Sequence, residues 1–231
     1  NRFQYVMFTL CLLKWLVGAM MLIAPNFLFL STDFICNGEN GSWDCQEWVC
    51  SYNDQGIWRK HMGSVPKSLT YEFEWYVCSK KWVVPLVQSM LYLGTVIGYM
   101  TVPYFADNFG RRRVERIVWG IATVGILLIS TSMTIVTVGI GLFLCGTGIP
   151  TAMSLHYCFL NELVIGKTRS RMVMWLQLTY SMGIFLIALL AMMIPNWRMF
   201  SIFCLALPII ILNFGCRYLE ETPEFSYKKS P

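Results

Sequence analysis

Long apolar runs without charged residues dominate this chain and limit what it can fold into. Such runs cover residues 82–106, 117–161, 172–197 and 199–216, and Lys14 is the only charged residue between positions 3 and 32. A helix needs about 20 apolar residues to cross a hydrocarbon core about 30 Å thick. Because the runs are continuously apolar and show no alternation, they favour transmembrane helices over a transmembrane barrel.

The run over residues 117–161 is about twice as long as one span requires, so we expect a tight turn near Ser130, Thr131 and Ser132. The sequence then predicts an all-α membrane protein with six transmembrane helices. Residues 1–30 hold the first helix and residues 82–218 the other five, with an outer loop at 31–81 and a tail at 219–231. The expected spans are 6–29, 82–105, 117–130, 135–160, 172–194 and 199–218.

The composition excludes other classes of protein. Only 13% of the 231 residues are charged and 56% are hydrophobic, whereas soluble domains contain about 25% charged residues. Aromatic residues make up 15% of the chain and the net charge is only +5, which is the opposite of a disordered protein. The basic residues lie in short clusters between apolar runs, and this argues against nucleic-acid binding.

Lysine and arginine residues concentrate on one side of the predicted membrane. They cluster at 111–116, 167–171 and 217–229, whereas acidic residues outnumber basic ones in the loop at 31–81. Cytoplasmic loops of membrane proteins carry an excess of lysine and arginine. Both termini are therefore expected on the cytoplasmic side.

The outer loop carries features of a segment outside the cytoplasm. It contains an even number of cysteines, namely Cys36, Cys45, Cys50 and Cys78. They predict two disulfides whose pairing the sequence leaves open, and a zinc site is the weaker alternative because only Cys45 and Cys50 are closely spaced. Asn40 begins a glycosylation sequon, Asn40-Gly41-Ser42. These features favour the plasma membrane, with a mitochondrial inner membrane as the alternative.

Several motifs occur in the order found in one transporter family. Residues 74–82 (EWYVCSKKW), Gln88-Ser89 and Gly94-x₃-Gly98 resemble the entry to the second helix of the organic cation/anion transporters, a solute-carrier family of the major facilitator superfamily. Residues 103–113 (PYFADNFGRRR) resemble the superfamily signature between the second and third helices. Residues 162–164 with Arg169 resemble the turn after the fourth helix, and residues 221–223 (ETP) resemble the start of the central linker.

The resemblance implies that the loop at Asp107 latches the two halves of a transporter together in one conformation. The implied latch residues are Asp107, Gly110, Arg111, Arg112, Arg113, Glu162 and Arg169. On chemical grounds we expect Asp107 just past a helix end, where its carboxylate accepts hydrogen bonds from backbone N–H groups of the next helix. Gly110 would permit a turn with positive φ. Without the resemblance, the arginines are explained by the positive-inside rule alone.

The sequence departs from the family pattern at several points. Pro103 replaces a glycine, Asn108 replaces a basic residue, Leu142 replaces an arginine of the fourth helix, and Glu224 replaces a basic residue of the linker. Family members have about twelve helices in two halves, with the substrate site between the halves. A chain of six spans is therefore expected to need a second half, a homodimer partner or other membrane subunits.

Two polar residues inside the predicted spans are candidates for a substrate cavity. Lys14 lies within the first span, and no Asp or Glu lies within any of the six expected spans. Its amine is therefore expected either to extend to the interface or a partner chain, or to attract an anionic substrate. His156 is expected to be a hydrogen-bonded packing residue, with proton relay as the less favoured alternative.

Two functions are compatible with these features. The first is a transporter half that moves small organic ions by alternating access in lipid, and the second is a transport-inactive structural subunit of a larger membrane complex. We expect no enzymatic activity, because no catalytic set, metal cluster or cofactor motif is visible in the sequence.

Overall fold

The computed structural model describes residues 2–29, 35–38, 41–44, 69, 82–163, 167–194 and 196–215. This part of the chain is helical apart from one β-hairpin. In chain order the elements are α1 (Arg2–Leu28), β1 (Ile35–Gly38), β2 (Gly41–Asp44), α5 (Val83–Phe109), α6 (Arg111–Ser130), α7 (Ile135–Leu163), α8 (Lys167–Met193), α9 (Trp197–Phe200), the π-helix η2 (Ser201–Ala206) and α10 (Leu207–Gly215).

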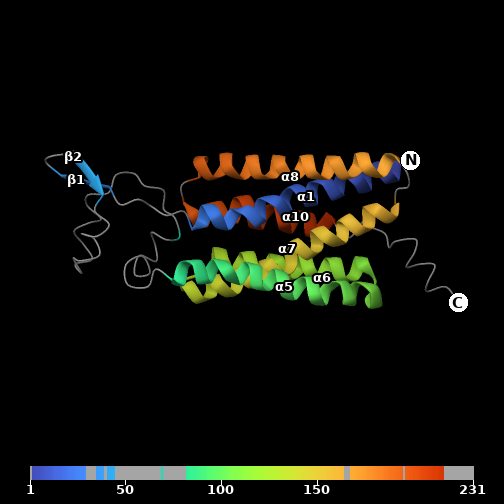
Figure 1. Cartoon of the computed structure of the whole chain (residues 1–231), viewed down its shortest axis with the longest axis horizontal. Coiled ribbons are helices and arrows are strands. Elements are labelled where there is room, and N and C mark those ends of the chain that lie inside the picture. The colour runs from blue at the N-terminus through green and yellow to red at the C-terminus, as the bar shows by residue number, and fades with distance from the viewer. Residues whose placement is uncertain are drawn as a thin grey trace.

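The helices lie side by side in one elongated bundle (Figure 1). In that view α8 and α1 lie along the upper side, α5 and α6 lie along the lower side, and α7 crosses obliquely between them. α7 packs against α5 and α6 and also contacts α1, which in turn packs along α8. α7 is therefore the helix that joins the two groups.

Four of these helices are long and apolar enough to cross a membrane, namely Phe8–Leu28, Val83–Phe109, Ile135–Cys158 and Arg169–Met193. α6 begins at Arg111 rather than at the expected residue 117, so its first turns carry charged residues. The segment Trp197–Leu212 is a shorter apolar helix. The described helices thus support the all-α membrane class. Two of the six expected spans, 117–130 and 199–218, are not among the helices that are long and apolar enough to cross a membrane.

The predicted break in the long apolar run is confirmed. α6 ends at Ser130 and α7 begins at Ile135. The Ser130 hydroxyl donates to the carbonyl of Ile126 at 2.9 Å, and the Ser132 hydroxyl donates to that of Ile129 at 2.7 Å. Both hydroxyls are thus hydrogen-bonded to backbone carbonyls of the last turns of α6.

Glycines allow α5 and α7 to approach each other closely. A Cβ atom added at Gly94 would overlap the carbonyl oxygen of Phe143, and one added at Gly146 would overlap that of Leu91. The predicted use of Gly94 and Gly98 for close helix packing is therefore confirmed. Pro103 lies inside α5, which continues to Phe109.

The outer loop contains a β-hairpin that the sequence analysis did not predict. β1 and β2 pair antiparallel, with Ile35 opposite Asp44 and Gly38 opposite Gly41. The predicted disulfide residues Cys45, Cys50 and Cys78 and the predicted glycosylation site Asn40 lie outside the described residues. The backbone of Cys36 belongs to β1, and its side chain is not among those described. The disulfide and glycosylation expectations therefore remain predictions.

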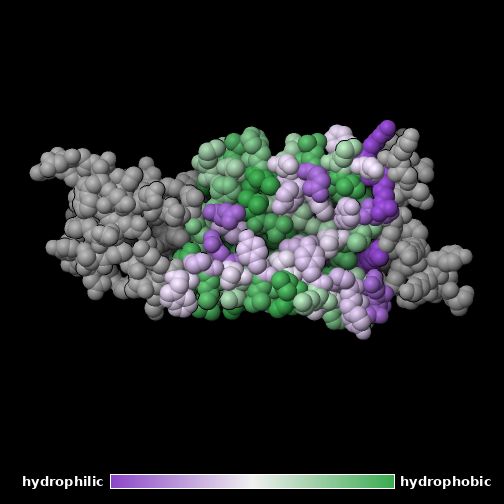
Figure 2. All heavy atoms as spheres, in the orientation of Figure 1, coloured by the Kyte–Doolittle hydropathy of each residue, from purple (hydrophilic) through white to green (hydrophobic). Residues whose placement is uncertain are grey.

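The outer face of the bundle is apolar. Met100 on α5 and Met192 on α8 are 75% and 76% exposed, and many other large apolar side chains of these helices are also exposed. In the view of Figure 2, hydrophilic side chains gather most strongly at the right-hand end, where α6 and α8 begin. Exposed apolar surface of this extent suits contact with lipid or with further membrane helices.

Candidate functional site: a buried carboxylate shared by lysine and histidine

Glu115 is placed inside the bundle by the way α6 begins. Gly110 ends α5 and starts α6, and its φ of 95° is one that glycine adopts without steric cost. Because α6 follows at once, Glu115 lies about 7 Å along that helix at 1.5 Å per residue. Only 12% of its side chain is exposed. A carboxylate is therefore held between helices whose other buried residues are mostly apolar.

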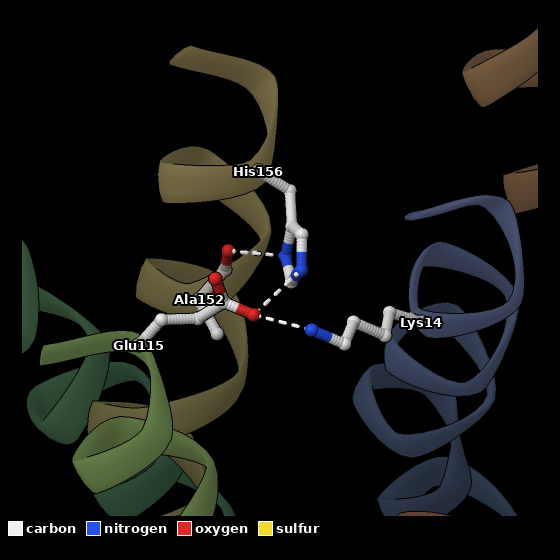
Figure 3. Close-up of polar contacts among 4 residues, drawn as sticks. All are labelled: Lys14, Glu115, Ala152 and His156. Atoms are coloured by element: carbon white, nitrogen blue, oxygen red, sulfur yellow. Dashed lines mark hydrogen bonds and ion pairs between the residues drawn. The ribbon is translucent and has the colours of Figure 1, made fainter. Parts of the chain in front are cut away.

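One carboxylate oxygen of Glu115 contacts two basic side chains from other helices (Figure 3). Lys14 Nζ, from α1, donates to Glu115 Oε1 and forms an ion pair with it. His156 Nε2, from α7, lies 3.0 Å from the same oxygen, which is an ion-pair distance although Nε2 has no well-aligned hydrogen bond. Lys14 and His156 are 1% and 2% exposed. We call Lys14, Glu115 and His156 the buried triad.

The imidazole of His156 is fixed from two further directions. Its Nδ1 lies 2.7 Å from the carbonyl oxygen of Ala152, one turn earlier on α7. The Trp119 ring packs edge-on against the imidazole, with centroids 6.2 Å apart and planes inclined at 66°. Trp119 follows Glu115 by one turn of α6. The ring plane and the direction of Nε2 are therefore set by α6 and α7 together.

The expectations for Lys14 and His156 share a premise that needs correction, although His156 is buried and contacts the Ala152 carbonyl as a packing histidine would. Both rested on the absence of an acidic residue from the spans, which was wrong because α6 begins earlier than the uncharged run and includes Glu115. Lys14 pairs with Glu115 within the chain, and His156 has an acidic neighbour. Sequence reasoning missed Glu115, although a lone acid among Arg111, Arg112, Arg113 and Arg116 was a signal that could have found it.

The triad satisfies charges that would be costly to bury alone. An ionised side chain in a low-dielectric interior costs several kcal/mol unless it is paired. α1 and α6 share few backbone contacts, so the long side chains of Lys14 and Glu115 span the space between them. The arrangement provides a cation, an anion and a titratable imidazole around one oxygen, a set that can bind, hold or release a proton.

The residues of the expected latch are placed differently from the prediction. Asp107 lies inside α5 and is 73% exposed, with Oδ1 4.0 Å from Arg111 Nη2. No side chain caps α6 at Gly110, so the expected capping role of Asp107 is wrong. The expected positive φ of Gly110 is confirmed. Arg169 Nε donates to Asn161 Oδ1 at 2.9 Å.

The remaining residues of the expected latch lie at the end of the bundle where α6 begins and α7 ends. Arg112 and Arg113 lie in the first turn of α6. Glu162 belongs to α7, and its side chain is not among those described. Leu142, which replaces the expected arginine, is buried in the core. Within the described ranges, no group of three or more His, Cys, Asp or Glu residues could hold a metal ion.

Comparison with known proteins identifies relatives of the chain. The family model described as "Sugar (and other) transporter" matches residues 20–231. Solute carrier family 22 member 2 of Rattus norvegicus is 30% identical over 161 residues, which cover 68% of this chain and 28% of that protein. Solute carrier family 22 member 1 of Bos taurus is 27% identical over 172 residues, with the same shares. The chain thus spans less than a third of the length of these curated relatives.

A solved structure shows the same fold. The inward-open conformation of the xylose transporter XylE from E. coli superimposes with a TM-score of 0.63 at 15% sequence identity. The match covers 96% of this chain and 50% of that transporter. The resemblance to solute-carrier transporters of the major facilitator superfamily, inferred from motifs, is confirmed. Since the family model covers nearly the whole chain, the chain belongs to the sugar (and other) transporter family.

Proposed function

We propose that the chain forms a six-span half of a major facilitator transporter that moves small organic ions by alternating access. The observation that carries the proposal is the superposition of 96% of the chain on 50% of a xylose transporter. In this assignment α6 is the third span, and α9, η2 and α10 together form the sixth. A second half, from the same polypeptide or another, completes the transporter and encloses the substrate site.

We assign the helices to two three-helix repeats, as in other major facilitator halves. α1, α5 and α6 form the first repeat, and α7, α8 and the α9–α10 segment form the second. The buried triad then crosses from one repeat to the other, because Lys14 and Glu115 belong to the first and His156 to the second. We assign the triad a positioning role, in which it holds the two repeats together while this half rocks against its partner.

The relatives support the choice of substrate class. They are solute carriers of family 22, and the motifs of this chain resemble those of organic cation/anion transporters. The proposal places both termini and the cluster around Asp107 and Arg111 on the cytoplasmic side of the plasma membrane. The exposed apolar faces of α5 and α8 are the surfaces we assign to lipid and to the second half.

Reconstitution tests the proposal. The native polypeptide that contains this chain is purified in mild detergent, its intact mass and subunit composition are measured, and it is inserted into liposomes. Uptake of a panel of radiolabelled small organic cations and anions is then compared with protein-free liposomes. We expect at least one class to enter faster with protein, and E115Q to slow that uptake at equal protein content. G120A is the matched control, because a Cβ at Gly120 has nothing within 4 Å.

Two outcomes would overturn the proposal. One is a folded, monodisperse protein that moves no member of the panel. The other is stoichiometric recovery of the chain with other membrane subunits and no uptake by that complex, which would support the structural-subunit function instead.

A further inference from the structure

The imidazole of His156 has an oxygen near each of its ring nitrogens. Nδ1 lies 2.7 Å from the carbonyl oxygen of Ala152, and Nε2 lies 3.0 Å from Oε1 of Glu115. A carbonyl oxygen can only accept a hydrogen bond. A carboxylate likewise only accepts. Figure 3 shows the ring between these two oxygens, with Lys14 approaching Oε1 from the opposite helix.

A neutral imidazole cannot satisfy both contacts, because it carries a single N–H. If that hydrogen is on Nδ1, the lone pair of Nε2 faces a carboxylate oxygen that is itself rich in electrons. If it is on Nε2, the lone pair of Nδ1 faces the carbonyl of Ala152. One additional proton removes the conflict, either as an imidazolium beside a carboxylate or as a carboxylic acid that donates to Nε2.

We propose that the Glu115–His156 contact is a binding site for one exchangeable proton. The proton-bound form ties α7 to α6, and release of the proton breaks either the Nε2–Glu115 contact or the Nδ1–Ala152 contact. Lys14 forms an ion pair with the same carboxylate oxygen from the side of α1. The site does not depend on the proposed transport function, since it is defined by proton binding alone.

Other charged residues lie on α6 and α8, apart from the buried triad. His156 and Lys14 both act on the carboxylate of Glu115. On α6 the arginines at 111–113 and 116 flank Glu115, and on α8 Arg169 and Arg171 are exposed. α10 contributes no titratable side chain to the packing.

Nuclear magnetic resonance can detect this proton directly. The full native protein is labelled with ¹⁵N-histidine in lipid nanodiscs and titrated from acidic to alkaline pH. This chain contains two histidines, His61 and His156, so H156Q identifies the His156 signals. We expect both nitrogens of wild-type His156 to be protonated at acidic pH, and one proton to be lost in a single step that leaves the hydrogen on Nδ1.

The E115Q variant provides the discriminating comparison. Without the carboxylate, we expect the pH dependence of the His156 signals to differ from that of the wild type. If E115Q does not fold, the titration of His156 is compared with that of His61 in the same sample. His156 ¹⁵N shifts that do not change with pH, or that change together with those of His61, would overturn the proposal, as would a titration identical in wild type and folded E115Q.

Discussion

Lys14 and Glu115 lie 101 positions apart in the chain, yet the ammonium of one donates to the carboxylate of the other in the buried space between α1 and α6. His156 of α7 contacts the same carboxylate oxygen. Three helices that would otherwise meet through apolar side chains are thus joined at one atom.

Removal of the carboxylate should be strongly destabilising. E115Q keeps the size of the side chain but removes the carboxylate that pairs with the Lys14 ammonium, and breaking a buried ion pair by removing one partner typically costs about 3–5 kcal/mol. Reversible unfolding in mixed micelles would measure the free energy. D107N is the matched control: Asp107 is 73% exposed, and an exposed ion pair contributes at most about 1 kcal/mol. Equal losses in the two variants would contradict the structure.

A double variant should recover much of that loss. In K14M/E115L both charges are absent, and apolar replacement of a buried ion pair is often neutral or stabilising by about 1–4 kcal/mol. We therefore expect K14M/E115L to unfold at higher denaturant than either K14M or E115L. The double-mutant cycle would give the coupling energy. Additive losses would show that Lys14 and Glu115 do not interact in the folded protein.

The sequence predicted the helices better than it predicted the triad, for a physical reason. Uncharged runs mark the part of a helix that lies in hydrocarbon. The excess length of the run 117–161, with Ser130, Thr131 and Ser132 inside it, located the break between Ser130 and Ile135 correctly. A helix continues beyond that part, however, and α6 extends back to Arg111. The rule that excluded charged residues from spans therefore excluded Glu115, the acid that pairs with Lys14.

Patterns within single helices could not predict the contacts between helices. Which residues of α1, α6 and α7 meet depends on how the helices cross, and no spacing in the sequence gives that. Asp107 was expected to cap α6, but the turn occurs at Gly110, so Asp107 remains in the last turns of α5. The small-residue pattern at Gly94 and Gly98 succeeded because a close helix approach requires the absence of a side chain.

The α5–α7 interface should not accept a methyl group at Gly146. In G146A the new Cβ would overlap the carbonyl oxygen of Leu91, and forced overpacking typically costs about 1–3 kcal/mol. G120A introduces the same methyl group on α6 where nothing lies within 4 Å, so helix propensity should make it neutral or stabilising by up to about 1 kcal/mol. Unfolding of both variants in mixed micelles would check the difference. A G146A protein as stable as G120A would rule out the close approach of α5 and α7.

The contact between α9 and the turn that joins α6 to α7 should depend on the guanidinium of Arg198. Its Nη2 donates to the carbonyl of Ser132 at 3.3 Å, and its Cζ lies 5.2 Å from the centroid of the Trp197 ring. Hydrogen bonds to charged groups contribute about 1.5–3 kcal/mol, so we expect R198A to lower the free energy of unfolding by about 2 kcal/mol. R198K keeps the charge but loses the planar fork that reaches the carbonyl and stacks on the ring. It should therefore fall between wild type and R198A, and an R198K protein as stable as wild type would show that charge alone is enough.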